Sequence, residues 1–172
     1  KLDPYFRKNA HHMMTFSMEY AYSENYMLVL SHDEVVHLKC SMIEKMPGSY
    51  EEKFKNLMAG YAFMTGHPGK KLLFMGQDFG QHREWSEERE LDWFLLEKEP
   101  NHQLQLFVKE LLHLYKSNKC LYEYDCWPEG FEWINADDGD RSIFSFVRHS
   151  ASGKNNMLFV INFTPVERPD YR

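Results

Sequence analysis

The sequence predicts an α/β segment followed by an all-β segment, because the spacing of its apolar residues changes along the chain. Up to about residue 117, short runs of consecutive apolar residues alternate with stretches in which apolar residues recur at helical spacing. After that point apolar and polar residues alternate, and Asp-Gly and Ser-Gly dipeptides separate the runs. We therefore expect a first domain at residues 1–118 and a second at residues 119–172.

The first domain opens with an expected amphipathic helix and a buried strand. Four apolar residues lie at helical spacing within residues 14–22, namely Met14, Met18, Ala21 and Tyr22. Residues 27–30, Met-Leu-Val-Leu, are apolar at every position. Such a run predicts a strand covered on both faces, as in a parallel sheet flanked by helices.

A longer helix is expected to begin after Ser49. Ser49 and Glu52 have the spacing of a capping box, in which each side chain binds the backbone N–H of the other residue. The helix would end at Gly66 and Pro68. Its apolar stripe comprises Phe54, Leu57, Met58, Tyr61 and Ala62. A second buried strand at residues 72–75 completes a parallel strand–helix–strand unit.

The last helix of this domain is expected to follow Asn101, which has the side chain of a good N-cap. Its inner face would carry Leu104, Phe107, Val108, Leu111 and Tyr115. We interpret the following runs "FEWI", "SIFSFV" and "NMLFVINF" as an antiparallel meander. The aromatic residues taken as its core are Phe131, Trp133, Phe144 and Phe146.

Two parallel strands cannot form a stable sheet by themselves, because their outer edges stay unpaired. The architecture therefore requires more strands than the sequence supplies. The simplest solution is the last strands and helices of a (β/α)₈ TIM barrel, which needs about 250 residues in full. The beginning of an antiparallel β-sandwich domain would follow it. The sequence also starts at Lys1 and not at methionine, so we expect a part of a longer chain.

Composition excludes several classes of function. The chain has 172 residues, of which 43% are hydrophobic, and a net charge of −6. This balance offers no basic patch for nucleic acid or anionic lipid, and no apolar run reaches the roughly 20 residues of a membrane helix. The three cysteines form no C-x-x-C pair, which argues against a disulfide framework or a zinc ribbon and favours the cytoplasm. We expect no nucleic-acid or membrane partner.

The first candidate site is Ser31-His32-Asp33-Glu34, directly after the strand at residues 27–30. In one interpretation Ser31 or Asp33 caps a following helix, and His32 is incidental. In the other, Asp33 projects into a pocket at the C-terminal end of the strand, where barrel enzymes carry their active sites. Composition leaves both open. His32 and His37 are five residues apart, which does not fit a helical zinc pair, and we expect no metal or cofactor.

The second candidate site is "GQDFGQHREW", residues 76–85, after the second predicted strand. The side chains that could hydrogen-bond or stack with a sugar are Gln77, Asp78, Gln81, Arg83 and Trp85. An alternative is that Asp78 and Arg83 form a structural ion pair while Trp85 packs within the loop. The nearby "GHPGKK", residues 66–71, lacks the spacing of a phosphate loop and is more simply a helix stop.

Several motifs together resemble bacterial glycogen branching enzymes of the α-amylase clan. They are "LSHDEVVH", "MPGSYEEKFKNLMAGYAFMTGHPGKKLLFMGQDFGQHREW", "LDW" and "CWPEGFEWINADD", and the similarity runs from about Phe6 to Phe163. The resemblance implies a retaining 1,4-α-glucan branching transferase that forms α-1,6 branches. Its partners would be an α-glucan and the remainder of the parent enzyme. The Asp nucleophile and Glu acid/base come from earlier barrel strands outside this chain, so the chain alone would be inactive.

The resemblance also assigns roles. Asp33 matches the third acidic residue of the family, which binds the hydroxyls at carbons 2 and 3 of the sugar at the cleavage site, and His32 matches its companion. Such hydrogen bonds strengthen as the ring becomes oxocarbenium-like. The sequence departs from the family at Leu38 and Cys40, where glycine and arginine are frequent, and at Asp78, where glutamate is usual. A related hydrolase and a non-catalytic glucan-binding module remain alternatives.

Overall fold

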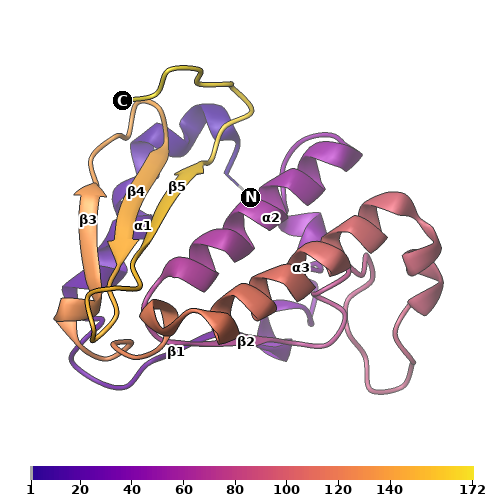
Figure 1. The fold of residues 1–172 in the computed structure, drawn as a ribbon. Coiled ribbons are helices and arrows are strands. Elements are labelled where there is room, and N and C mark those ends of the chain that lie inside the picture. The colour runs from indigo at the N-terminus through magenta and orange to yellow at the C-terminus, as the bar shows by residue number, and fades with distance from the viewer. Residues whose placement is uncertain (1) are drawn as a thin grey trace.

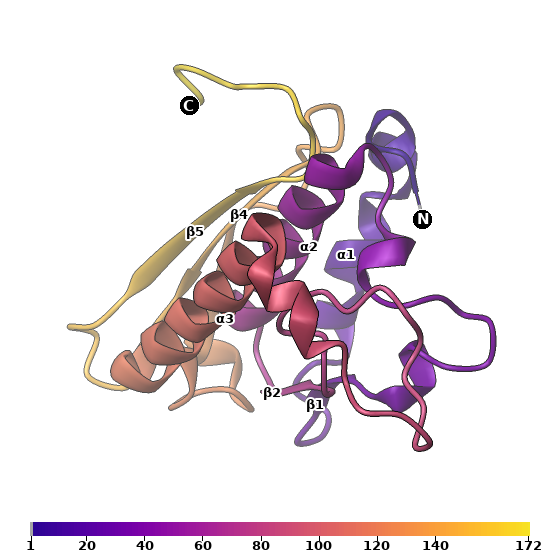
Figure 2. The same ribbon diagram turned by 90° about the vertical axis from the view of Figure 1, so that its right-hand side faces the viewer.

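The computed structural model describes residues 2–172. In chain order its elements are α1 (His12–Thr15), β1 (Met27–Leu30), α2 (Tyr50–Gly66), β2 (Lys70–Leu73), α3 (Glu99–Ser117), β3 (Phe131–Asn135), β4 (Ile143–Arg148) and β5 (Met157–Asn162). Helices α2 and α3 run side by side, with the three-stranded sheet β3-β4-β5 to one side and the pair β1-β2 below them (Figure 1). Helix α1 lies on the side of α2 away from α3 (Figure 2).

Helix α2 forms as its sequence predicts. The Ser49 side chain accepts from the backbone N–H of Glu52, and the Glu52 carboxylate accepts from that of Ser49 at 2.7 Å, so the capping box is confirmed. The helix ends at Gly66, ahead of Pro68. Its buried stripe packs on α3 around Ile43, Phe54, Leu57, Tyr61, Leu104 and Val108.

Strands β1 and β2 pair in parallel, from Met27 opposite Lys70 to Leu30 opposite Leu73. The first strand has the predicted bounds, whereas the second begins two residues earlier than expected and ends at Leu73. The expectation that both faces of the first strand are covered is wrong for the described residues. Met27 and Val29 are 52% and 47% exposed, because α2 covers only the opposite face within residues 2–172.

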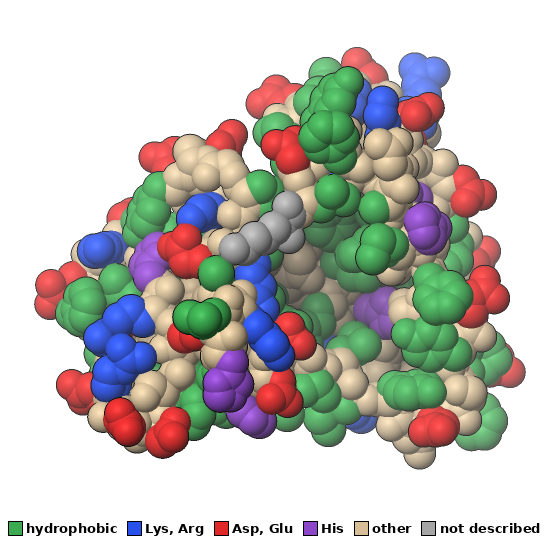
Figure 3. Space-filling view, turned by 180° about the vertical axis from the view of Figure 1, so that it is seen from behind, with side chains coloured by type: hydrophobic (Ala, Val, Ile, Leu, Met, Phe, Trp, Pro, Cys, Tyr) green, Lys and Arg blue, Asp and Glu red, His purple; other side chains and the backbone are tan. Residues whose placement is uncertain are grey.

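The N-terminal helix is shorter than predicted. Its α-helical part ends at Thr15, and a 3₁₀ turn continues from Phe16 to Glu19. The Thr15 hydroxyl donates to the carbonyl of His12, a local hydrogen bond of the kind that competes with regular helix. Hydrophobic side chains gather on the surface where these N-terminal segments lie (Figure 3), and Met13 and Phe16 are the most exposed large ones there after Tyr5.

Asn101 is not the N-cap of α3, which corrects the prediction. The helix starts at Glu99 with Pro100 in its first turn, a position that suits proline. The side chain of Asn101 is fully buried and donates to the carbonyls of Phe79 (2.8 Å) and Gly80 (3.2 Å). It therefore fastens the loop after β2 to the helix. Leu104 and Val108 are buried as predicted.

The antiparallel meander is confirmed, with strand order β3-β4-β5. Phe144 and Phe146 are buried, and Phe131 and Trp133 pack against them as predicted. The same cluster includes Phe63 of α2, so the sheet packs directly on that helix. The domain boundary near residue 118 remains a prediction.

A buried ion pair connects the sheet with the end of α2. Arg148 is fully buried and donates to the Asp125 carboxylate at 3.0 Å and to the carbonyl of Gly66 at 2.8 Å. Burial alone would raise the pKa of Asp125, but the charges of Lys71, Lys70 and Arg148 hold it below its usual value. The paired charge thus stays ionised inside the protein. No helix within residues 2–172 is long and apolar enough to cross a membrane.

Candidate functional site

Strand β1 ends at Leu30, and a capped turn follows it. The Ser31 hydroxyl accepts a hydrogen bond from the backbone N–H of Asp33 at 3.2 Å, which starts a 3₁₀ turn from His32 to Glu34. Ser31 therefore caps the turn, as the first interpretation expects. The carboxylate of Asp33 takes no part in that cap, and its side chain is 68% exposed. The geometry leaves this carboxylate accessible to a ligand.

The loop after β2 reaches the same edge of the sheet, because β1 and β2 are parallel. The imidazole of His32 lies 5.9 Å from the ring of Phe74 and 6.3 Å from the indole of Trp85, measured between centroids. Its Nε2 lies 3.4 Å from the Asp33 carboxylate. Of the predicted site residues, the structure thus brings Asp33, His32 and Trp85 together. They form an acidic group beside an aromatic wall, an arrangement that can bind and stack on a polar ring.

Gln77 and Gln81 are buried beneath this edge. Gln81 accepts from the backbone N–H of Asp92 at 3.0 Å and donates to the carbonyl of Arg83 at 3.2 Å. The side-chain amide of Gln77 makes no hydrogen bond to any of residues 2–172, although it is 3% exposed. Both glutamines line one small cavity with Trp85. Gln81 is committed to the loop, whereas Gln77 keeps its amide atoms available.

Asp78 lies apart from the other candidates. It lines a cavity of about 330 Å³ between β2, α2 and α3, together with Tyr61 and Lys71. The Gln105 side chain approaches its carboxylate at 3.5 Å. The structure does not place Asp78 on the aromatic wall beside His32.

The proposed ion pair between Asp78 and Arg83 is wrong, because Arg83 binds Asp92 instead. Its guanidinium donates through Nε at 2.8 Å and through Nη2 to the two oxygens of that buried carboxylate. The hydrogen bonds from Arg83 hold the pKa of Asp92 below its usual value. A bidentate contact of this kind fixes the relative orientation of the two side chains. Arg83 therefore holds the loop to Asp92.

Sequence reasoning missed the carboxylate that fastens the two loops to each other. Glu84 accepts from the backbone N–H of Leu38 at 3.1 Å and from that of Cys40 at 2.7 Å. The backbone N–H of the next residue, Trp85, donates to the carbonyl of Val35 at 3.0 Å. Every residue except proline has a backbone N–H, so the sequence does not indicate which of them Glu84 binds.

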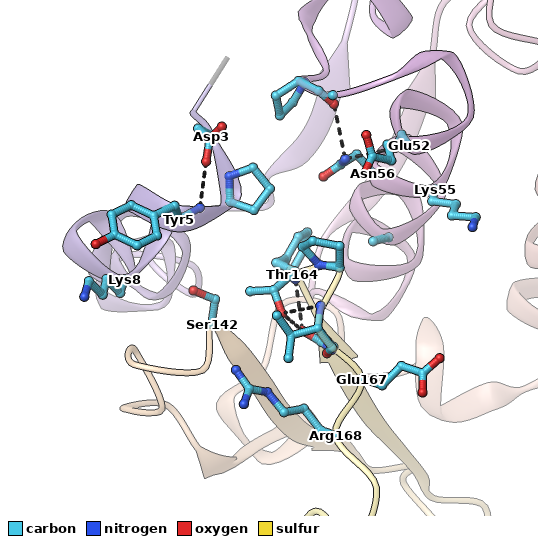
Figure 4. A pocket seen from close by; sticks show the side chains of 18 of the residues that line it. Asp3, Tyr5, Lys8, Glu52, Lys55, Asn56, Ser142, Thr164, Glu167 and Arg168 are labelled. Carbon is cyan, nitrogen blue, oxygen red and sulfur yellow. Dashed lines mark hydrogen bonds between the residues drawn. The ribbon is translucent and has the colours of Figure 1, made fainter.

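A third cavity, of about 720 Å³, lies elsewhere in the fold (Figure 4). It is lined by the N-terminal segment, the first half of α2 and the segment after β5, including Tyr5, Lys8, Asn56, Thr164 and Arg168. Both acidic and basic side chains line it, among them Asp3, Glu52, Lys55 and Glu167. None of the predicted site residues lines it, so we place the candidate site at Asp33.

Comparison with known proteins shows which proteins the chain resembles. Residues 133–172 match the family model of the α-amylase C-terminal all-beta domain. The chain is 62% identical over its whole length to the 1,4-alpha-glucan branching enzyme GlgB of Butyrivibrio fibrisolvens. It is 54% identical to that of Aquifex aeolicus and 51% to that of Roseobacter denitrificans, each over 99% of the chain. The predicted resemblance is confirmed. The chain spans 23–27% of the length of these relatives.

Proposed function

We propose that this chain is a segment of a 1,4-α-glucan branching enzyme, a glycosyltransferase that cleaves an α-1,4 chain and rejoins it to a 6-hydroxyl. The observation that carries the proposal is the identity of 48–62% along essentially the whole chain to enzymes of that name. The exposed carboxylate of Asp33 at the end of β1 agrees with it. The three cysteines, without a C-x-x-C pair, favour a cytoplasmic enzyme.

In this proposal Asp33 and His32 hold the hydroxyls at carbons 2 and 3 of the glucose whose bond is cleaved. Hydrogen bonds to the 2-hydroxyl strengthen as positive charge develops on the ring, which contributes several kcal/mol to transition-state binding. An ionised acceptor makes a stronger hydrogen bond than a neutral one. The nucleophile and the acid/base belong to the remainder of the parent enzyme, so the isolated chain does not branch glucan.

Trp85 supplies an aromatic face beside His32 on which a sugar ring can stack. Gln77 offers a buried amide at the same edge. In this proposal Arg83 and Asp78 also bind substrate. The Arg83 side chain remains half-exposed beside its contact with Asp92, and Asp78 faces its own cavity. The glucan is therefore contacted from both loops that follow the parallel strands.

The parallel pair β1-β2 represents the last strands of a (β/α)₈ barrel in this proposal. The exposed side chains of Met27 and Val29 would be covered by parts of the parent chain outside residues 2–172. The meander β3-β4-β5 begins the C-terminal β-sandwich, whose second sheet would cover the exposed Leu158 and Val160 of β5. Residues 1–118 and 119–172 then belong to two domains of the parent.

The parent enzyme, incubated with amylose, tests the function. Debranching the product with an isoamylase and counting the released short chains measures the α-1,6 bonds formed. We expect new branches without a matching rise in free reducing ends. Reducing ends without branches would show a hydrolase, and binding of amylose without either product would show a glucan-binding module. Either result contradicts the proposal.

A further inference from the structure

The loop that follows the Asp33 turn has a strained backbone. Three residues other than glycine adopt left-handed φ angles, His37 at 56°, Leu38 at 64° and Cys40 at 68°. Side chains disfavour this region of φ. Packing of its own side chain does not hold Leu38 there, since the residue is 94% exposed. Such a loop keeps its shape only when other groups impose it.

Glu84 is a group outside the loop that holds this shape. Its two carboxylate oxygens accept separately, Oε2 from the Leu38 N–H and Oε1 from the Cys40 N–H. Backbone N–H groups in turns of this kind converge on one point and form a small anion site. Hydrogen bonds to an ionised acceptor are about twice as strong as neutral ones. One carboxylate thus offsets strain at both residues.

The residue between these two amides connects the loop to Asp33. The Lys39 ammonium donates to the backbone carbonyl of Asp33 at 2.8 Å. Its position along the loop depends on the backbone of Leu38 and Cys40, which Glu84 holds. A continuous chain of contacts therefore runs from Glu84 through residues 38–40 to the main chain of Asp33.

We propose that Glu84 is a positioning residue for Asp33, acting through Lys39. The inference rests on the proposed function, because it assigns Glu84 to the orientation of a carboxylate that binds the glucan. Glu84 itself touches backbone amides of the neighbouring loop, so it does not act on the reacting atoms. Its contribution is to fix the direction of Asp33 before substrate arrives.

The parent enzyme carrying Glu84→Gln tests the proposal. Glutamine keeps the size of the side chain but replaces one of the two acceptor oxygens by an NH₂ group. One of the two backbone N–H groups, of Leu38 or Cys40, then loses its acceptor. Glu87→Gln is the matched control, because Glu87 is an exposed glutamate of the same loop. We expect kcat for branching to fall by up to about 100-fold in Glu84→Gln. Hydrogen exchange of peptides covering residues 35–40 should become faster in that variant only.

A double-mutant cycle with Lys39→Met separates positioning from a general loss of stability. If Glu84 acts through Lys39, the double variant loses about as much kcat as the more impaired single variant. Leu38→Gly, which removes one strained side chain, should restore part of the activity of Glu84→Gln. Unchanged exchange at residues 35–40, unchanged kcat, or losses that multiply in the double variant would each overturn the inference. A wild-type parent that forms no branches contradicts the proposed function instead, and the exchange comparison still decides whether Glu84 holds the loop.

Discussion

Ser31 caps the turn that carries Asp33, and it does so with its own hydroxyl at 3.2 Å from the Asp33 backbone nitrogen. The carboxylate of Asp33 is therefore not needed for the cap. Within this short segment, the Ser31 hydroxyl accepts the hydrogen bond from the backbone N–H of the turn. The acidic side chain of Asp33 is left exposed to solvent. The structural and the functional interpretation of this motif are compatible, because different residues fulfil them.

Ser31→Ala in the parent enzyme should weaken this turn. Loss of a capping oxygen costs about 1 kcal/mol, and an unanchored turn would orient Asp33 less well. We expect a lower midpoint of urea unfolding and a reduced kcat/KM for branching. Ser31→Thr keeps a hydroxyl at the same position and should behave nearly as the wild type. Equal activity of the alanine and wild-type enzymes would show that the cap does not orient Asp33.

Leu38→Gly should stabilise the protein, contrary to the usual effect of glycine. Leu38 adopts φ 64° and is 94% exposed, so its side chain costs backbone strain and gains little packing. Relief of left-handed strain is worth about 1 kcal/mol. Leu112→Gly is the comparison, because Leu112 is an exposed leucine inside α3 and its replacement should cost about 1 kcal/mol. Thermal unfolding that shows the same sign for both variants would contradict the strain argument.

Two glycines of α2 should respond to alanine with opposite signs. A Cβ at Gly66 would lie 2.8 Å from the Phe159 ring and 2.9 Å from that of Phe146, whereas one at Gly60 meets nothing within 4 Å in the described chain. Overpacking costs about 1–3 kcal/mol, and alanine in a helix gains about 1 kcal/mol over glycine. Urea unfolding of Gly66→Ala and Gly60→Ala measures both. Equal stability of the two variants would argue against the tight contact between α2 and the sheet.

Acid should destabilise the protein through His67. Burial lowers the pKa of His67 to about 4. The charges of Lys71 and Arg148 also lower this pKa, whereas the hydrogen bond to the Pro68 carbonyl and the charge of Asp125 raise it. The unfolded chain binds the proton with a pKa near 6.5, so between about pH 6.5 and 4 the unfolded state takes up more protons. Stability therefore falls as pH falls through this window.

His67→Gln removes this titration and keeps a side chain able to hydrogen-bond Ser17, which lies 2.8 Å from Nε2. The wild type should lose more stability than His67→Gln between pH 7 and pH 4.5, because the carboxylates common to both cancel in the difference. Unfolding midpoints at several pH values provide the measurement. Parallel curves for the two proteins would show that His67 keeps an ordinary pKa.

Local signals predicted the parts of the fold that local interactions form. The capping box of Ser49 and Glu52 involves neighbours in sequence, and the alternation in β3, β4 and β5 reports directly on which side chains face the core. Asn101 departs from its predicted role as N-cap because its partners, the carbonyls of Phe79 and Gly80, are distant in sequence. A good capping residue can serve equally well as a buried anchor.

The sequence predicts the location of the candidate site, because the site follows the ends of two parallel strands. The loops that carry His32 and Trp85 follow parallel neighbouring strands, so topology brings the two loops to one edge of the sheet. The partner of Arg83 and the contacts of Glu84 depend on loop conformations, including the left-handed residues 37, 38 and 40. Leucine and cysteine rarely adopt left-handed φ angles, so the sequence does not predict this loop conformation or the contacts that depend on it.

Replacing one carboxylate tests the central claim most directly. Asp33→Asn in the parent enzyme, with Glu34→Gln as the neighbouring control, keeps side-chain size and removes the charge. We expect branching of amylose by Asp33→Asn to fall by about 1,000-fold, equivalent to about 4 kcal/mol of transition-state binding. Glu34→Gln should remain close to the wild type, and the unfolding midpoints of all three should agree. A folded Asp33→Asn enzyme with full branching activity would contradict the account.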